Sequence, residues 1–420
     1  MKEEKLVLVY NILNIQMLDI NILKRAVTEK LFCDDTFSFI IKNLKDKNHN
    51  LVPLNDFEQL VKKYPKKKKC WCLSGLSFID CHFAKNRNFF DKKPTKIKKI
   101  LNKKECLHKN VSICSNDIIK AHSISKKGAL TSISENNHVY GLKFDFNGFI
   151  FKKIGINDAS TFYGFCKKHD EFLFSSFEKH DFNKTQKQLF DLCYRAICQE
   201  HYTMLRVIDI LHEIKLNKDI NDNFKGQIEF QITINSQIKF YELGIKYSNY
   251  YKKNLEKKYS LLNYEDNLQH YVFELNDNYP KFQSSTCFNL EYDLEGNQLQ
   301  DLDKAEIQSK NIFVNCISLQ QKGYFIISWF KENTDYGKQI INSIISKPLL
   351  IEDKLFSLAF LYIHNTFVSP VWFESLTDSQ KIDLENLRIF WAEKEKFSTS
   401  MIQDNMDSIK IENHYFLNTA

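Results

Sequence analysis

Residues 70–82 read Cys-Trp-Cys-Leu-Ser-Gly-Leu-Ser-Phe-Ile-Asp-Cys-His, which places four soft metal ligands within thirteen residues. The four are Cys70, Cys72, Cys81 and His82. A tetrahedral zinc site takes four sulfur or nitrogen ligands, and nearby lysines ease deprotonation of the thiols. Two cysteines on a tight turn, met by a Cys-His pair on the returning chain, supply all four. The segment is therefore predicted to fold around a structural metal ion.

The order Cys-x-Cys-x-Ser-Gly-x5-Cys-His resembles the SEC-C motif, a small zinc-binding module. One position departs from the motif, because Leu73 follows the second cysteine where glycine is usual. The resemblance implies a closed structural site and a docking surface, not a catalytic centre. A cysteine-rich surface loop without metal is the alternative interpretation.

A second set of zinc-type ligands follows along the chain. Cys106 and Cys114 precede an apolar run that ends at His122, and Cys166 and His169 stand in a later Cys-x-x-His sequence. A pair of cysteines, a strand ending in His, a loop, and Cys-x-x-His opening a helix resemble the ββα-metal, treble-clef module of HNH endonucleases.

That resemblance implies both a structural and a catalytic site. The implied structural zinc ligands are Cys106, Cys114, Cys166 and His169. His122 would be the general base, and Asp170 would hold Mg²⁺ or Mn²⁺ beside the scissile phosphate. Phosphodiester cleavage suits this set, because it needs a base with a pKa near neutrality and a hard cation to stabilise developing charge.

The chain departs from the HNH pattern in three places. Seven residues separate the first two cysteines, which is a longer spacing than the family usually has. Thr161 stands where the family has its middle Asn, with Asn157 and Ser160 nearby, and Asn157 is the candidate for that role. Ala121 precedes the proposed base, where Asp or His is common. These departures affect the prediction of catalysis more than the prediction of the fold.

Other polar residues near the clusters have structural interpretations beside the functional ones. His108 is expected in a solvated loop, although it is an alternative zinc ligand, and His138 is expected on a returning strand. A solvated helix end is expected at Glu178, His180 and Asp181. The cysteines in apolar surroundings are expected to be small buried hydrophobes: Cys33, Cys193, Cys198, Cys287 and Cys316.

Basic charge is concentrated around the proposed zinc ligands. Residues 60–127 hold 19 Lys and Arg residues against 4 acidic ones, a net charge of +15, whereas the whole chain carries +7. Such a segment attracts polyanions, because neutralised phosphates release counterions. We therefore expect a nucleic-acid partner, with a protein partner left open. A solvated Lys-rich linker, above all at 66–69, is the alternative.

The composition indicates a folded globular protein, with 43% hydrophobic and 14% aromatic residues. The apolar run 6–23 is interrupted by polar residues, so neither a membrane-spanning helix nor a secretory signal is expected. Cysteines clustered with histidines favour metal over disulfides in a reducing compartment. The predicted location is the cytoplasm.

Hydrophobic periodicity predicts an α+β fold class, with small zinc-stapled modules between a helical N-terminal segment and a C-terminal region of helices and antiparallel sheet. The predicted segments are a helical segment at 1–64, the SEC-C motif at 66–100, the HNH-like module at 101–183, a helical hairpin at 184–262 and an α+β domain at 263–420. Residues 226–258 are ambiguous between strand and helix, and helix is favoured.

Particular elements are predicted in the C-terminal half. The predicted strands are 270–275, 287–292, 312–317 and 324–329, and the predicted helices are 336–346 and 351–364. Trp329 and Trp372 are expected to pack in the core and not to stack on nucleic-acid bases. No glycine-rich phosphate loop and no Gly-x-Ser-x-Gly sequence stands after residue 184.

Two functions from different classes follow from these features. The first is a metal-dependent HNH-like nuclease, with a role in bacterial defence. The alternative is a zinc-structured adaptor that binds nucleic acid or protein without hydrolysis. Residues 68–376 also resemble a group of uncharacterised bacterial SEC-C-containing proteins, through stretches such as Ser-Pro-Val-Trp-Phe-Glu-Ser at 369–375. That resemblance implies a shared architecture and no particular activity.

Overall fold

The computed structural model describes residues 65–70, 75–81, 94–108, 110–145, 148–217, 224–260, 264, 267–276, 280–302, 304, 307–392 and 397–417. The helical segment predicted at 1–64, Cys33 and the proposed ligands Cys72 and His82 lie outside the described residues. The chain divides into two compact units. The first comprises Met1–Leu101 and Met204–Gly244, and the second comprises Asn102–Thr203 and Ile245–Ala420.

Three helices contribute to the described part of the first unit. Helix α6 (Pro94–Leu101) opens with a proline, which has no N–H to leave unpaired in the first turn. Helices α9 (Gln186–Asn217) and α10 (Phe224–Ser260) each contribute residues to both units. Their buried apolar side chains form one cluster with α6: Ile97, Val207, Ile210, Leu211, Ile214, Ile234 and Ile238.

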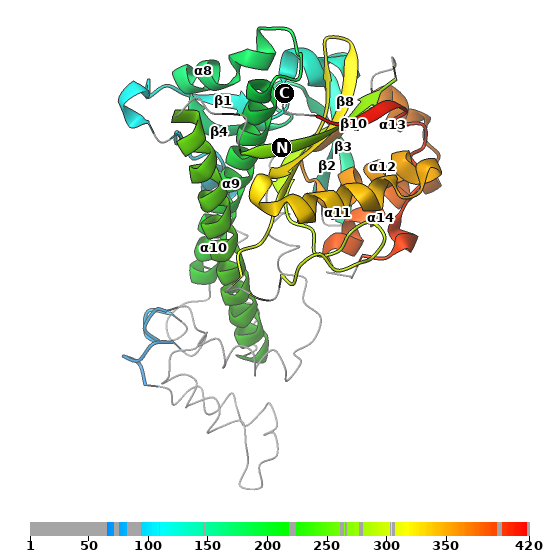
Figure 1. Cartoon of the computed structure of the whole chain (residues 1–420). Helices are drawn as coiled ribbons and strands as arrows, with labels where there is room; N and C mark the ends of the chain where they lie inside the picture. Colours follow the sequence, from blue (N-terminus) through cyan, green and yellow to red (C-terminus); the bar gives the residue numbers. More distant parts are fainter. Residues whose placement is uncertain are drawn as a thin grey trace. The chain divides into compact units, whose positions relative to one another are not determined.

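An eight-stranded sheet organises the second unit (Figure 1). Across the sheet the order is β10 (Ile411–Phe416), β5 (Leu268–Leu275), β8 (Lys322–Phe330), β7 (Ile312–Leu319), β6 (Phe282–Phe288), β9 (Thr366–Val368), β2 (His138–Asp145) and β3 (Gly148–Gly155). Every neighbouring pair is antiparallel. Strands from the segment 101–183 therefore share a sheet with strands from the segment 263–420.

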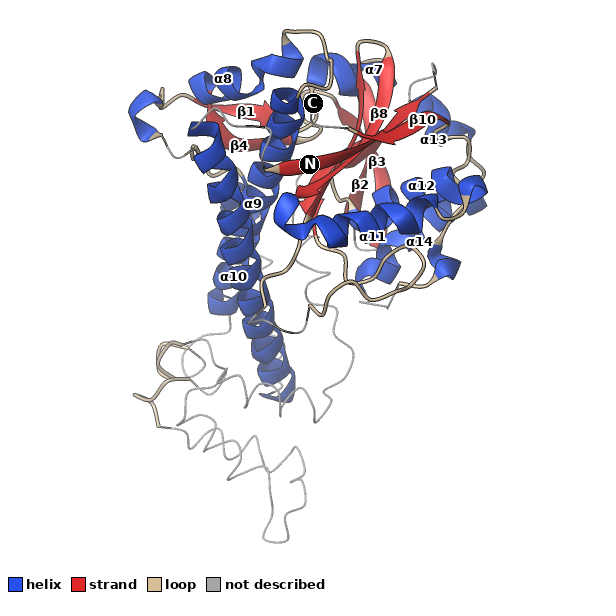
Figure 2. Cartoon of the chain, viewed as in Figure 1, coloured by secondary structure: helices blue, strands red, loops and turns tan. Residues whose placement is uncertain are grey.

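Helices pack on both faces of this sheet (Figure 2). Successive residues of a strand point to opposite faces. Accordingly, Ile326 joins the apolar cluster that includes α9, whereas Ile327 joins the cluster that includes α11 (Thr334–Ile345) and α12 (Ile351–Tyr362). Every residue of β7 is buried, which is the result of cover on both faces.

A smaller two-stranded sheet pairs β1 (Ile118–His122) with β4 (Thr161–Cys166) in antiparallel fashion. The hairpin β2–β3 lies between these strands in the sequence but belongs to the large sheet. Helix α8 (Lys167–Glu178) follows β4 directly. Its buried Leu173, Phe174 and Phe177 recur at helical spacing and join the same apolar cluster as α9.

Shorter elements complete the second unit. They are α7 (Thr131–Ile133), α13 (Pro370–Ser375), α14 (Asp378–Ala392) and single turns at Val111–Ile113, Lys126–Leu130, Lys331–Asn333, Pro348–Leu350 and Thr399–Met401. Across the described ranges, no helix combines the length and the apolar composition needed to cross a bilayer.

The predicted α+β class with antiparallel sheet is confirmed. The strands predicted at 270–275, 312–317 and 324–329 and both predicted C-terminal helices are present as well. The ambiguous stretch 226–258 is helical in α10. Trp329 and Trp372 are buried, and their indole N–H groups donate to Gln269 Oε1 and Met406 O.

The strand predicted at 287–292 is wrong in position, because β6 runs from Phe282 to Phe288. Four consecutive polar residues, 283–286, are buried in β6. Because they are polar, the sequence shows no apolar pattern that would predict a strand at this position. The chain after β6 instead forms a turn around Asp293, whose Oδ1 accepts the N–H groups of Glu295 and Asn297 at 2.9 Å.

Candidate metal centre

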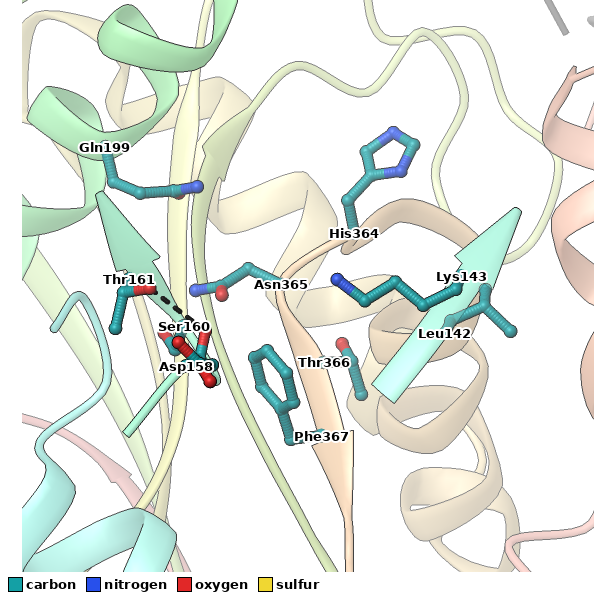
Figure 3. Close-up of a pocket in the computed structure, with 10 residues that line it drawn as sticks. All are labelled: Leu142, Lys143, Asp158, Ser160, Thr161, Gln199, His364, Asn365, Thr366 and Phe367. Carbon is teal, nitrogen blue, oxygen red and sulfur yellow. Dashed lines mark hydrogen bonds between the residues drawn. The ribbon is translucent and has the colours of Figure 1, made fainter. Parts of the chain in front are cut away.

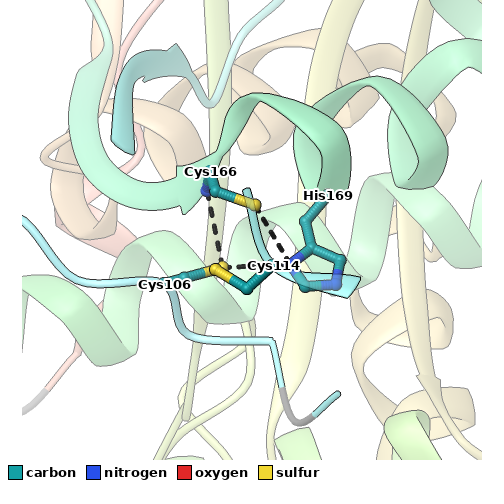
Figure 4. A group of neighbouring side chains, drawn as sticks. All are labelled: Cys106, Cys114, Cys166 and His169. Atoms are coloured by element: carbon teal, nitrogen blue, oxygen red, sulfur yellow. Dashed lines mark hydrogen bonds between the residues drawn. The ribbon is translucent and has the colours of Figure 1, made fainter. Parts of the chain in front are cut away.

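Four proposed ligands converge in the second unit (Figure 4). They are Cys106, Cys114, Cys166 and His169, and one ligand atom from each lies within 4.8 Å of the others. The His169 Nδ1 atom is 3.1 Å from the sulfur of Cys106 and 3.3 Å from that of Cys166. Three thiols and an imidazole thus face a common centre.

The junction of β4 and α8 positions two of these ligands. Cys166 is the last residue of β4 and the N-cap of α8, with the extended backbone typical of that position. His169 stands three residues later in the first turn of the helix. Because residues three apart share a helix face, both side chains point the same way. The Cys-x-x-His spacing alone produces this half of the centre.

Backbone hydrogen bonds bring Cys106 beside β4. The N–H groups of its neighbours Glu105 and Leu107 donate to the carbonyls of Tyr163 and Gly164 at 3.2 and 2.9 Å. The segment around Cys106 therefore extends the β4 edge as a short paired stretch. This pairing places the Cys106 thiol next to the start of α8. The position of Cys106 therefore depends on β4 and not on its spacing from Cys114.

The thiols of the centre differ in acidity. Burial raises the pKa of Cys106 from 9.0 to about 11. Burial also acts on Cys166, but the backbone N–H groups of Ser115 and His169 outweigh it and lower the pKa of that thiol to about 7. The Ser115 N–H lies 3.4 Å from the Cys166 sulfur. Backbone donors at one end of the centre thus favour the thiolate form that a metal requires.

The donor set and its dimensions fit a metal ion such as zinc. Zinc–sulfur bonds near 2.3 Å and zinc–nitrogen bonds near 2.0 Å in a tetrahedron place the ligand atoms about 3.5–3.8 Å apart. The nitrogen–sulfur distances of 3.1 and 3.3 Å and the outer limit of 4.8 Å bracket that range. Cys166 and His169 are buried, whereas Cys106 and Cys114 are partly exposed.

His108 supports the centre from outside the group of four. Its ring centroid lies 4.2 Å from that of His169, and its Nδ1 accepts the N–H of Asn110 at 3.2 Å. Burial first, and the neighbouring His169 second, lower the pKa of His108 to about 4. The imidazole therefore stays neutral and packs against the proposed ligand His169.

Two of the four proposed ligands of the first cluster, Cys70 and Cys81, lie within the described residues. Cys70 and Cys81 are 1% and 2% exposed. The Cys70 N–H donates to the Leu76 carbonyl at 2.6 Å, and Lys69 pairs with Ser77 in an antiparallel bridge. Cys70 is therefore buried next to this bridge. The other two proposed ligands lie outside the described residues.

His122 ends β1, opposite Thr161 of β4. Its Nε2 donates a 2.9 Å hydrogen bond to the Ile156 carbonyl. Burial lowers the pKa of the imidazole, with a further lowering by the charge of Arg195. Asn157 is exposed in the turn that follows β3.

Asp170 lies in the first turn of α8 beside a buried cation. Its Oδ1 is 4.0 Å from Nη2 of Arg195 and, within the described chain, has no hydrogen-bond partner. Burial raises the pKa of this carboxyl, against the opposing charge of Arg195. Arg195 is 1% exposed and donates to Glu178 at 2.7 Å.

Sequence reasoning missed Arg195. The available signal was a lone arginine within the otherwise apolar stretch 192–198 of α9, where a charge must find a buried partner. Glu178, which was expected at a solvated helix end, is that partner.

A polar pocket of about 200 Å³ lies in the second unit (Figure 3). Its wall includes Lys143, Thr161, Gln199, His364 and Asn365. His122 does not line the pocket. Thr161, which pairs with His122 across the two strands, does line it.

Comparison with known proteins yields no relative. No protein-family model, curated protein or solved structure matches this chain. Its function therefore has to be inferred from its own residues and their geometry.

Proposed function

We propose that this protein is a metal-dependent nuclease that hydrolyses nucleic-acid phosphodiesters with the element formed by β1, β4 and α8. The observation that carries the proposal is the position of His122. It ends the first strand of an antiparallel pair whose second strand leads into a helix bearing Cys166 and His169. In space this gives the strand–strand–helix arrangement of the HNH resemblance, although the β2–β3 hairpin stands between the two strands in the sequence.

The imidazole of His122 has the form that a general base needs. Because Nε2 donates to the Ile156 carbonyl, its proton is fixed there and Nδ1 keeps a lone pair. Burial lowers the pKa, so the ring is neutral at neutral pH. His122 thus accepts a proton from water at Nδ1 and is held in one orientation by the carbonyl.

Two kinds of metal site belong to this proposal. Zinc at Cys106, Cys114, Cys166 and His169 would be structural and would fix the start of α8, and a second zinc would bind at the 70–82 cluster. Asp170 would hold the catalytic Mg²⁺ or Mn²⁺, and its Oδ1, which has no hydrogen-bond partner among the described residues, fits such a role. The cation, when bound, would supply electrostatic stabilisation of the phosphate.

Exposed lysines support a nucleic-acid substrate. In the segment 60–127, whose net charge is +15, the described lysines at 66–69 and at positions 98, 99, 103 and 104 are exposed. Lysines of this kind position a phosphate backbone without reading its sequence.

Binding without hydrolysis is the second candidate function. It is favoured by the contact between Asp170 and Arg195, because a guanidinium at 4.0 Å competes with a cation for the carboxylate. The adaptor would keep the zinc sites and the basic surface and would lack turnover.

The deciding experiment incubates the full chain with labelled DNA and RNA in Mg²⁺ or Mn²⁺. His122→Ala should reduce cleavage by about 10²- to 10⁴-fold, the usual contribution of general base catalysis. Bound zinc should not change. The matched control is His138→Ala, because His138 is exposed at the start of β2 and lies outside the proposed site. Wild-type cleavage by the His122 variant would eliminate the proposed base, and salt-sensitive binding with no cleavage by the wild type would favour the adaptor.

A further inference from the structure

The wall of the polar pocket is joined to the end of β1 by hydrogen bonds. Ser123 follows His122, and its Oγ lies 2.6 Å from Oγ of Ser160 and accepts the Asn365 Nδ2–H at 2.9 Å. Ser160 and Asn365 both line the pocket. The pocket is therefore fixed in position relative to the strand end that carries the proposed base.

One part of the pocket suits an anion. Lys143 brings a positive charge to the wall, and His364 and the amide of Gln199 face the same space (Figure 3). The acidic residue of the wall, Asp158, is paired with Lys120, which offsets its charge. An ammonium group and neutral polar groups in one wall are the kinds of group that contact a phosphate.

Another part of the pocket offers acceptors. The amide protons of Asn365 are committed to the Ser123 hydroxyl and the Ser285 carbonyl, so Oδ1 remains to accept. The Thr161 hydroxyl donates to the Asp158 carbonyl at 2.9 Å, so its oxygen also remains to accept. A ligand that combines a phosphate with hydroxyl or amino donors matches both parts.

The size of the pocket points to one unit of a polymer. Its volume of about 200 Å³ is below the ~300–1,000 Å³ of sites that enclose a whole small ligand. A nucleotide within a strand needs only part of its surface enclosed, since the rest of the chain continues into solvent.

We propose that this pocket holds one nucleotide of the nucleic-acid strand, with its phosphate at Lys143 and its hydroxyl or amino donors at Asn365 and Thr161. The adjacent phosphodiester then lies toward His122, a position that rests on the proposed nuclease function. Binding in the pocket does not depend on that function.

The test measures binding of short single-stranded DNA and RNA by fluorescence anisotropy, without added Mg²⁺ or Mn²⁺, so that hydrolysis does not interfere. Lys143→Gln should weaken binding about tenfold. It should also reduce the slope of log affinity against log salt concentration by about one, the value of one lost phosphate contact. Lys153→Gln is the matched control, because this exposed lysine of β3 lies outside the pocket and pairs with Glu374. It should bind within twofold of the wild type.

Equal affinities of the two lysine variants would overturn the nucleotide subsite. Competition by a nucleoside monophosphate as strong as by the oligonucleotide would also overturn it, because the pocket would then take a free nucleotide. A preference for RNA over DNA that is lost in Thr161→Val, which removes the acceptor oxygen, would identify the ribose hydroxyl as one of the donors. The His122→Ala cleavage assay is read separately, so either proposal can fail while the other stands.

Discussion

Nδ2 of Asn365 donates a 2.9 Å hydrogen bond to Oγ of Ser123, across 242 positions of the sequence. The same amide donates to the Ser285 carbonyl at 2.8 Å, within the large sheet. One buried side chain thus ties the two-stranded sheet, which carries the candidate site, to the eight-stranded sheet. A buried amide that satisfies both of its N–H groups fixes a unique arrangement of the elements it joins.

Removal of one ligand should remove one metal ion from the centre. Cys166→Ser is expected to bind one equivalent of zinc less than the wild type, measured by elemental analysis of the purified chain. The unfolding free energy of the variant should also be lower than that of the wild type, because bound zinc no longer stabilises the fold. The difference should be about 4 kcal/mol when free zinc is 1,000-fold above the dissociation constant. Cys316→Ala is the control, since Cys316 is buried in the sheet core outside the centre. Equal zinc content in both variants would contradict the site.

The rate of cleavage should depend on pH through His122. Its pKa is lowered by burial, with Arg195, Lys126 and Lys120 adding repulsion. A base with a lowered pKa stays deprotonated to lower pH, so the midpoint of the acid limb of the activity profile should lie below pH 6.5. A pH profile of kcat/KM measures this. A midpoint above 6.5 would mean that another group limits the reaction.

Stability should fall in acid because of His270. This imidazole is 2% exposed, its Nδ1 lies 2.7 Å from the Ser328 hydroxyl, and burial lowers its pKa to about 3. Between pH 3 and 6.5 the unfolded chain binds a proton that the folded chain does not. Unfolding free energy should therefore decrease as the pH falls through this window, by at most about 1.4 kcal/mol per unit from this residue.

Urea unfolding of the wild type and of His270→Gln at several pH values tests this assignment. The variant should show a shallower decrease below pH 6.5, whereas the exposed His138→Gln should keep the wild-type slope. Identical slopes for all three proteins would assign the acid sensitivity to other groups.

The buried ammonium of Lys354 should need the Glu295 carboxylate. Lys354 is fully buried and donates to Glu295, to the Ser343 carbonyl and to Ser346 Oγ. Hydrogen bonds from Lys354 and then Lys347 lower the pKa of Glu295 to about 2. The pair therefore contributes stability above the unfolded carboxyl pKa near 4.5, and that contribution is lost as the pH falls toward 2.

Glu295→Gln should destabilise the protein by about 3 kcal/mol, because it leaves a buried charge without its counter-charge. Lys347→Gln should cost less than about 1 kcal/mol, since Lys347 contacts the same carboxylate from an exposed position. Chemical denaturation of the two variants makes the comparison, and equal losses would refute the role of burial.

Gly337 should tolerate no side chain. A Cβ at this position of α11 would lie 2.1 Å from Cδ2 of Trp329, which is fully buried. Gly337→Ala is expected to cost about 1–3 kcal/mol or more, because the indole has no space to move. The control is Gly155→Ala at the end of β3, where the nearest atoms are 4.0 Å away and a change within about 0.5 kcal/mol is expected. Thermal unfolding distinguishes the two.

Local patterns predicted the elements that depend on neighbouring residues. The Cys-x-x-His spacing indicated that Cys166 and His169 share one face of a helix start, and this arrangement is present. Alternation and helical periodicity likewise located β7, β8 and the two long helices. These patterns did not predict the position of the polar strand β6, because its burial comes from strands and helices that are distant in sequence.

By itself, the sequence determined the coarse fold class, the residue types of the candidate metal centre and the helix that carries two of them, since each follows from local spacing and periodicity. Only the tertiary structure decided that the strands at 138–155 complete the large sheet, that Arg195 lies beside Asp170, and that a polar pocket forms next to the end of β1. The physical reason is that hydrogen bonds such as that between Ser123 and Asn365 join groups whose separation along the chain leaves no periodic signal.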